Sequence, residues 1–357
     1  MIADAPWLLP LSGLFSGLVL GGVARHFRFC TLSALERHWY AADSRGLRTW
    51  VLAAAVAIVA TQALVVANLV DVDRSFYLLP RLGLAGAIVG GVLFGIGMAL
   101  VGTCGFGALV RLGGGSLRSL IVVAVIGLTA VSTQLGPLGV VRERFFEPLS
   151  VDLAPAMSQS IPSLVEAFSG LPIGWPAAFL CLTALLYWVF RDSAFRHDRT
   201  AIASGSVIGL CIAFGWLATS QLGRYLFDPV QIESASFVLP PGQLIQQLTY
   251  VNGGSADYGV GLLVGVVVGA AVVARIGDDV SWEACDDASE LRRHLLGAVL
   301  MGMGGVLAAG CTIGQGVSAV SLLAVSAPIV LASMALGARI GLSWLLEGSP
   351  VSFLRAN

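Results

Sequence analysis

Charged residues are scarce in this chain of 357 residues, and lysine is absent altogether. Charged side chains make up 11% of the sequence, and all 20 basic residues are arginines. Because a soluble globular protein carries about 25% charged residues, the shortage excludes a surface that meets mainly water. A formal net charge of −1 also argues against nucleic acid as a partner. We interpret the absence of lysine as compositional drift of the kind that a GC-rich genome produces.

Metal-binding and disulfide patterns are missing too. The chain has only four histidines, and no two of its six cysteines have the C-x-x-C spacing. This excludes the usual zinc sites and a disulfide framework, and we expect neither a metal nor a cofactor. The N-terminus "MIADAPWLLP" lacks the basic region of a cleavable signal peptide, so the first apolar run is expected to remain as a span.

Long apolar runs are what the sequence does contain. Hydrophobic residues make up 57% of it, and runs near 20 residues recur from end to end, enough to cross a hydrocarbon core of about 30 Å. We predict an all-α polytopic membrane protein of about nine transmembrane helices plus short re-entrant helices. The third and eighth spans are short, rich in glycine and end at a cysteine, so we expect these to be broken or re-entrant. The predicted spans are residues 7–24, 48–70, 83–102, 117–135, 173–190, 201–220, 257–274, 294–309 and 321–346.

The distribution of arginine predicts the orientation. With the N-terminus outside, the inner loops and the tail hold fourteen arginines and the outer loops hold five. Because positive residues concentrate on the cytoplasmic side, we predict a multi-pass protein with its N-terminus outside and its C-terminus in the cytoplasm. The two longest loops, 136–172 and 221–256, would then both face outward.

An internal repeat is visible at a constant offset of 207 residues. "GGVLFGIGMALVGTCGFG" (90–107) and "GAVLMGMGGVLAAGCTIG" (297–314) share the pattern G-x-G-x6-C-x-x-G. Small residues four apart are common wherever membrane helices pack closely, but packing does not require the cysteine that stays in register. The predicted topology gives the copies opposite orientations, as in transporters built from inverted repeats. We predict one transport domain, 1–357, with pseudo-symmetric inverted halves at 1–172 and 173–357.

Three cysteines share a setting that suits anion binding. Cys30, Cys104 and Cys311 each follow an apolar segment and precede a short polar helix start. Such a start exposes free N–H groups, and after Cys30 the pair Ser33 and Glu36 has capping-box spacing. A neutral thiol in an apolar, glycine-lined setting can meet a soft sulfur-bearing anion without like-charge repulsion, and it releases the anion readily. We predict a relay through these thiols, with the further candidate residues Gly105, Gly107, Thr312, Gly314 and Gln315.

The remaining cysteines and the charges give weaker indications. Cys181 and Cys211 lie inside plain spans and Cys285 lies in an acidic loop, so we interpret them as ordinary side chains. Arg28 and Arg111 lie near Cys30 and Cys104 and either attract an anion or serve as positive-inside anchors. The spans contain no chain of Asp, Glu or His, which argues against a proton-coupled relay. Arg339 is the one clearly charged residue within a predicted span, so it is either near an interface or functional.

The cysteine segments resemble a known family. "LLGAVLMGMGGVLAAGCTIGQGVSAVS" resembles the second-half signature of the YeeE/YedE family, membrane proteins with a sulphur-transport domain. "FGIGMALVGTCGFGALVRLGGGSLRS" and "RFCTLSALE" resemble its other two segments. The resemblance implies thiosulfate uptake across the bacterial inner membrane, with Cys30, Cys104 and Cys311 handing on the anion. Family association adds a cytoplasmic sulfur-carrier or rhodanese-like protein as a partner, besides the anion and membrane lipid.

Other functions remain open on the sequence alone. A carrier or channel for a selenium compound or another small anion would use the same motifs. A membrane enzyme for thiol exchange or sulfur transfer would need a resolving cysteine close to the first, and none is visible. A structural subunit without substrate would leave the in-register cysteines unexplained. We therefore expect a transporter and not an enzyme.

Overall fold

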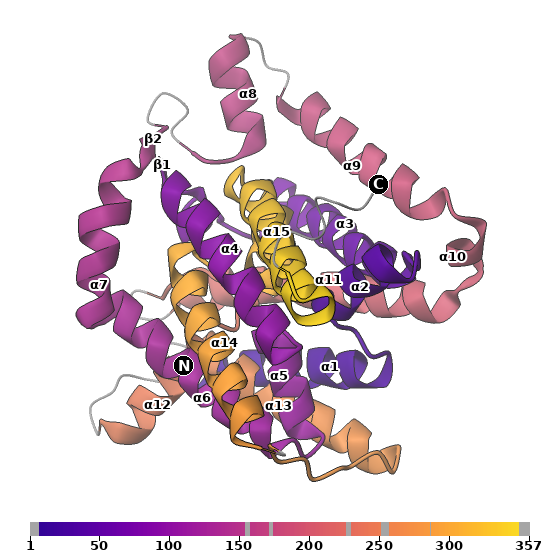
Figure 1. Ribbon diagram of the computed structural model, residues 1–357. Coiled ribbons are helices and arrows are strands. Elements are labelled where there is room, and N and C mark those ends of the chain that lie inside the picture. Colours follow the sequence, from indigo (N-terminus) through magenta and orange to yellow (C-terminus); the bar gives the residue numbers. More distant parts are fainter. Residues whose placement is uncertain are drawn as a thin grey trace.

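Helices account for nearly all of the regular structure (Figure 1). The computed structural model describes residues 7–153, 158–170, 174–225, 230–250, 257–285 and 287–349. The α-helices are α1 (Leu8–His26), α2 (Thr31–Tyr40), α3 (Arg45–Val66), α4 (Leu84–Val101), α5 (Gly105–Gly113), α6 (Leu117–Leu135), α7 (Pro137–Val141), α8 (Ile161–Ser169), α9 (Gly174–Phe190), α10 (Ser193–His197), α11 (Arg199–Gly223), α12 (Pro240–Thr249), α13 (Tyr258–Ile276), α14 (Ala288–Leu307) and α15 (Ser326–Glu347). The shorter elements are η1 (Phe76–Leu78), η2 (Arg142–Phe146), η3 (Glu147–Leu149), η5 (Gly314–Ala319) and an antiparallel strand pair, β1 (Arg81–Leu82) with β2 (Val151–Asp152).

The prediction of an all-α polytopic membrane protein is confirmed. Seven helical segments of the described chain are long and apolar enough to cross a membrane, and they are Leu8–Tyr40, Arg45–Val66, Leu84–Gly113, Leu117–Leu135, Arg199–Gly223, Tyr258–Ile276 and Ser326–Glu347. The other two predicted spans are also helical, as α9 and α14, but they fall outside this set. A total of nine crossings therefore stays a prediction.

Glycines spaced four residues apart bring α1 and α13 into backbone contact. Side chains added at Gly13, Gly17 and Gly21 of α1 would overlap backbone oxygens of α13, and glycines 261, 265 and 269 of α13 face α1 in the same way. Small residues at this spacing let membrane helices approach closely, where dispersion forces act over a long seam. Residue numbers rise together along the two helices, so α1 and α13 run parallel.

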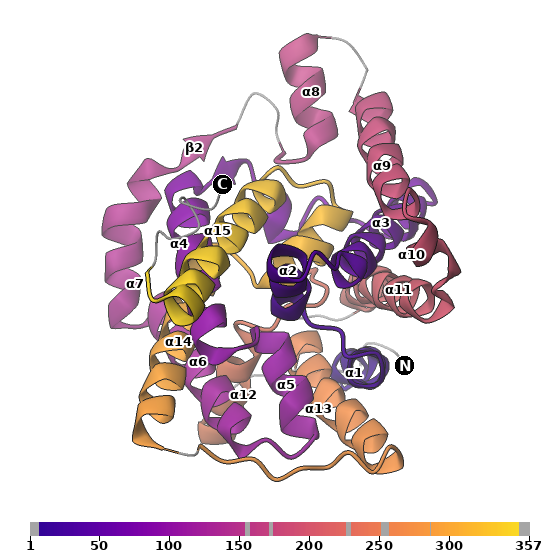
Figure 2. The same cartoon turned by 45° about the vertical axis from the view of Figure 1, so that its right-hand side comes forward.

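Helix α4 lies between α14 and α15 (Figures 1 and 2). Gly97 and Gly297 face each other's carbonyl oxygens, and so do Gly90 and Gly304, which makes α4 and α14 antiparallel. Helix α15 packs on another face of α4, where Gly95 meets Met334 and Ala338, and these two helices run parallel. The relative directions of α1, α4, α13, α14 and α15 are those required by the predicted order of crossings. Which end faces the cell exterior stays a prediction.

Two helix starts differ from the sequence prediction. Helix α2 begins at Thr31 with Cys30 as its N-cap, so Ser33 is already inside the first turn and the predicted capping box is wrong. The chain turns at Arg28, whose φ is 52°, and this turn sets the earlier start. The last long helix begins at Ser326 and not near residue 321, because the segment after Cys311 forms its own short helix that ends at Ser321. A turn at Leu323, where φ is 56°, separates the two helices.

The exposed side chains of the long helices are apolar. Examples are Phe15 on α1, Leu128 on α6, Leu210 on α11 and Leu336 on α15. Such a surface is costly in water and suits contact with lipid. Helices α8, α9 and α10 lie at the periphery in both views (Figures 1 and 2). The first residue of α8 still reaches the chain that follows the Cys311 segment, because the Ile161 N–H donates to the Leu323 carbonyl oxygen at 2.8 Å.

Candidate functional site

Cys104 occupies the break between α4 and α5. Gly102 ends α4 with a φ of 78°, a left-handed conformation that glycine adopts without strain. Cys104 is then the N-cap of α5, and its Sγ accepts from the N–H of Gly107 at 3.5 Å. The residue is 1% exposed. The predicted placement of a thiol at a helix start, beside free N–H groups, is therefore what the fold contains.

Cys311 repeats this arrangement after α14. The chain turns at Gly310, where φ is 152°, and a short helix follows from residue 312. The Cys311 Sγ accepts from the N–H of Gly314 at 3.3 Å, the same three-residue spacing as Cys104 and Gly107. Cys311 is fully buried. Both copies of the sequence repeat therefore place a cysteine sulfur at the start of a short helix.

The two thiol sites adjoin each other. The Thr312 hydroxyl lies close to the Cys104 thiol, although it has no hydrogen-bond partner of good geometry in the described part of the chain. The backbone of Phe237 lies between the sites, because its N–H faces Cys311 and its carbonyl oxygen would lie 3.2 Å from a Cβ on Gly105. The groups around the two sulfurs are thus backbone amides and a hydroxyl, which are donors without formal charge.

Cys30 lies at a water-accessible cavity and not in the buried centre. The cavity has a volume of about 740 Å³, and Cys30, Thr103 and Gly107 are among its lining residues. Cys30 is partly exposed and close enough to Cys104 for a charge on one sulfur to act on the other. The structure therefore brings all three predicted cysteines together, with Cys30 at an open end and Cys311 at a closed one.

Arginine side chains surround the cavity. Its lining includes five arginines and four acidic residues, and both predicted anion-attracting residues, Arg28 and Arg111, are among them. Arg25 is neutralised by Asp279, with 2.7 Å between Nη2 and Oδ2. Arg111 donates to the Gly102 carbonyl oxygen at 2.9 Å, which ties α5 to the end of α4. In the described ranges neither Arg28 nor Arg111 has an ion pair, so both charges remain available to an anion.

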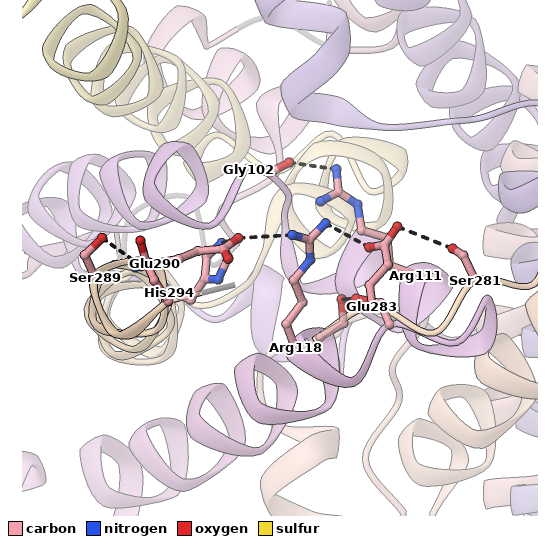
Figure 3. Close-up of polar contacts among 11 residues, drawn as sticks. Gly102, Arg111, Arg118, Ser281, Glu283, Ser289, Glu290 and His294 are labelled. Carbon is pink, nitrogen blue, oxygen red and sulfur yellow. Dashed lines mark hydrogen bonds and ion pairs between the residues drawn. The ribbon is translucent and has the colours of Figure 1, made fainter. Parts of the chain in front are cut away.

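A polar network lies beside this cavity (Figure 3), and its members Arg111, Ser281 and Glu283 line the cavity. The Arg118 guanidinium at the start of α6 binds Glu283 at 2.8 Å and Glu290 at 3.0 Å. The Leu117 N–H also donates to the Glu283 carbonyl oxygen at 2.8 Å. These interactions hold the loop after α13 against the starts of α6 and α14. The loop also lines the cavity beside Arg111.

Gln315 is held at the end of α14, and its predicted contact with an anion stays a prediction. Its amide nitrogen donates to the carbonyl oxygens of Ala308 at 2.8 Å and Ala309 at 3.1 Å. These carbonyls end α14, so the amide completes the turn and does not point a donor at the thiols. Its Oε1 is buried without a hydrogen-bond partner in the residues that the structure describes.

Sequence reasoning missed three hydroxyl residues of the site. Thr103 lines the cavity, and its buried hydroxyl has no hydrogen-bond partner within the described ranges. The Tyr77 hydroxyl and Ser236 Oγ lie 2.9 Å and 3.1 Å from the position that a Cβ on Gly314 would take. A signal was available, because Tyr77 and Ser236 belong to the similar segments "SFYL" (75–78) and "SFVL" (236–239).

The other cysteines lie outside this arrangement. Cys181 is exposed, and Cys211 and Cys285 are partly exposed. Arg339, within α15, stacks on Tyr40 at 4.6 Å and Trp39 at 5.4 Å, so it anchors α2 at the end of a span. No group of three His, Cys, Asp or Glu side chains in the described residues could hold a metal ion.

Comparisons with known proteins agree on one family. A family model described as sulphur transport matches residues 26–340. The chain is 27% identical over 360 residues to the thiosulfate transporter TsuA of Escherichia coli K12, which covers 95% of each chain. It is 24% identical over 324 residues to the thiosulfate transporter TsuA of Spirochaeta thermophila, covering 88% of this chain and 92% of the relative.

Proposed function

The chain belongs to the sulphur-transport (YeeE/YedE) family of membrane proteins, and from that premise we propose that it takes up thiosulfate or a closely related sulfur-containing anion. The anion passes between the neutral thiols of Cys311, Cys104 and Cys30. We propose that the protein is located in the bacterial inner membrane, with its N-terminus outside. A sulfur-carrier or rhodanese-like protein would receive the anion in the cytoplasm. The names of both relatives support the substrate.

One observation carries the proposal. Two cysteine sulfurs, each at the start of a short helix and each receiving an N–H at 3.3–3.5 Å, adjoin in the protein interior. Helix starts bind anions through free N–H groups, and a thiol adds a soft, weak donor. Neither sulfur has a basic side chain among the groups that act on it. A site without formal charge holds a dianion weakly, which suits a relay in which each site must release what it captures.

The arginine-rich cavity supports release on the inner side. Moving one charge across the membrane is worth about 2.3 kcal/mol per 100 mV, so an inside-negative potential opposes entry of a dianion by about twice that. Arg28 and Arg111 lower the energy of the anion while it is in the cavity next to Cys30, although the total electrical cost of entry is unchanged. In the proposed orientation, a closed Cys311 and an accessible Cys30 are the features expected of an inward-open state.

An enzyme of thiol exchange is the second candidate, and the structure offers it little support. All six cysteines are free. The groups next to the Cys104 and Cys311 thiols are backbone amides and a hydroxyl, and none of these is a base. A thiolate nucleophile needs a cation or a base to form at neutral pH. A selenium compound would use the same donors, so it is distinguished only by assay.

The proposed function is tested in proteoliposomes that contain the purified chain. Entry of ³⁵S-thiosulfate is expected above the level of empty liposomes, and unlabelled thiosulfate should compete while sulfate competes poorly. Growth of a sulfur-auxotrophic bacterium on thiosulfate provides the cellular counterpart. Uptake of selenite or selenate without uptake of thiosulfate would contradict thiosulfate as the substrate and identify a selenium compound in its place.

Arg28→Gln is expected to lower the uptake rate about twofold to fivefold at low ionic strength, because a rim charge acts mainly on association and release rates. The difference should shrink in 0.5 M salt, since exposed charges are screened within a few Å at that concentration. Initial rates at two salt concentrations measure this effect. Arg196→Gln is the matched control, because Arg196 is exposed on α10 and does not line the cavity. Equal rates for Arg28→Gln and the native chain at low salt would exclude an electrostatic role.

A further inference from the structure

Two carboxyl groups meet at the start of α13, in loops that the transport proposal does not use. Glu233 lies in the extended segment 230–239, and Asp257 is the N-cap of α13, with its Oδ1 accepting from the Val260 N–H at 2.9 Å. A Cβ on Gly259 would lie 3.3 Å from Glu233 Oε1 and 3.6 Å from Asp257 Oδ1. The two carboxyl groups are therefore neighbours on either side of the same glycine.

Within the described residues, this pair has no cationic partner. The groups acting on the charge of Glu233 are the Asp257 carboxylate and the Gly259 N–H, with no arginine or histidine among them. The facing residue from α11 is Thr219, whose hydroxyl donates to the Glu233 carbonyl oxygen at 2.8 Å. Burial, and then the negative charge of Asp257, raise the pKa of Glu233 to about 8. Burial likewise raises the pKa of Asp257.

Two buried tyrosine hydroxyls face Glu233. Tyr77 and Tyr258 are 3% and 1% exposed, and neither hydroxyl has a hydrogen-bond partner of good geometry in the described residues. A charge on Glu233 acts on both. The nearest hydroxyl neighbours are Ser236 for Tyr77 and Ser16 for Tyr258, so a cluster of buried hydroxyls adjoins the two carboxyl groups. Such a polar cluster in a protein interior is suited to binding a proton or a polar ligand. Tyr77 also faces Cys311, which connects this place to the thiols.

The carboxyl pair lies at the end opposite the arginine-rich cavity. Helices α1 and α13 run parallel, Asp257 precedes α13, and the cavity is lined by Arg25 at the far end of α1 and Asp279 just beyond α13. In the proposed orientation the pair faces the cell exterior, where the anion would enter.

We propose that Glu233 and Asp257 form a proton-binding site at the outer entrance, and that its protonation promotes occupancy of the Cys311 site by the sulfur anion. The step is a simple ionisation, in which the Glu233 carboxylate takes a proton from the external solution and later returns it. With the proton bound, one negative charge is removed from the approach to Cys311, so proton and anion favour each other's binding. This inference rests on the proposed function.

Glu233 and Asp257 lie outside the helical spans, in loops, so the absence of a chain of acids within the spans does not exclude a role for a proton. Only folding places Glu233 beside the start of α13, away from the positive charges of the opposite end.

The proton site itself is tested by infrared spectroscopy of the reconstituted protein. At pH 7 the native chain should show a protonated-carboxyl C=O band that is lost above about pH 9, because a group with a raised pKa keeps its proton until the pH exceeds that value. Glu233→Gln should lack this band. Glu166→Gln, which changes an exposed glutamate on α8, is the matched control and should retain it. An identical band in native and Glu233→Gln protein would overturn the proposal.

The coupling is tested by thiosulfate affinity at two pH values. The native Kd should be at least about fivefold weaker at pH 9 than at pH 6.5, since linkage makes the anion and proton effects reciprocal. Glu233→Gln mimics the protonated side chain and should bind with a Kd that is independent of pH. A pH-independent native Kd would overturn the coupling and leave the proposed function intact. Failure of thiosulfate to bind at any pH, with the carboxyl band present, would instead refute the proposed function and leave the proton site standing.

Discussion

Cys311→Ala is expected to reduce thiosulfate uptake to the level of membranes that lack the protein. Cys311 is fully buried, and its sulfur is the point at which the N–H groups of Gly314 and Phe237 converge. An alanine removes the thiol donor and leaves an apolar gap, so no group remains to receive the anion from the entrance. Loss of one buried sulfur atom costs about 1–2 kcal/mol of stability, so insertion and folding should persist. Uptake rates, normalised to the amount of protein in the membrane, measure the effect.

Two comparisons make the result specific for Cys311. Cys181→Ala removes an exposed thiol on the peripheral α9 and should leave uptake unchanged. Cys104→Ala should behave like Cys311→Ala, because the two sulfurs occupy equivalent positions in the repeat. Uptake at the native rate by well-inserted Cys311→Ala protein would remove the thiol relay from consideration.

Gly17→Val is expected to destabilise the whole bundle. Even the first added carbon would overlap the Leu262 carbonyl oxygen and approach within 2.8–2.9 Å of Val266 N and the Gly265 Cα. Backbone atoms cannot rotate away, so α1 and α13 must separate along their seam, and overpacking of this kind costs about 1–3 kcal/mol or more. The midpoint of thermal unfolding in detergent should fall by about 5–10 °C, with a parallel loss of uptake.

Gly22→Ala is the matched control on the same helix. A Cβ at Gly22 would lie 3.5 Å from Val273 Cγ2, which is ordinary van der Waals contact. This variant should unfold within about 2 °C of the native chain, because Ala favours helix over Gly and meets no backbone. Equal unfolding midpoints for Gly17→Val and Gly22→Ala would show that the α1–α13 seam does not limit stability.

Much of the site was visible in the sequence because its signal is local. A cysteine followed three residues later by glycine predicts a thiol at a helix start, and Cys104 and Cys311 both adopt this conformation. At Cys30 the same reasoning placed the cap too late, because a turn at Arg28 lets Cys30 itself begin the helix. Local sequence signals identify which residues have the right chemistry. The residue at which a helix begins also depends on the turn that precedes it.

The residues that sequence reasoning missed depend on contacts between distant segments. Tyr77 and Ser236 come close to the Cys311 segment because Gly314 leaves room for both. The similar segments "SFYL" and "SFVL" mark the two residues as related, but they do not indicate which part of the chain the residues contact. The hydrogen bonds of the Gln315 amide were not foreseen for a similar reason, since the carbonyls that accept from it belong to the end of α14. The polarity of a residue shows that it needs a partner, and the fold decides which partner it finds.

By itself, the sequence determined the class of protein, the membrane as its solvent, the family and the three cysteines. Composition and apolar run length fix the solvent through the hydrophobic effect, and motif spacing fixes local conformation. The tertiary structure alone decided that Cys30 lies at an open cavity and Cys311 at a closed one, that Arg28 and Arg111 share that cavity, and that Glu233 lies beside Asp257. These outcomes depend on how helices hundreds of residues apart pack through their glycines. The glycine spacing of one helix indicates that it packs closely, but it does not identify the partner helix.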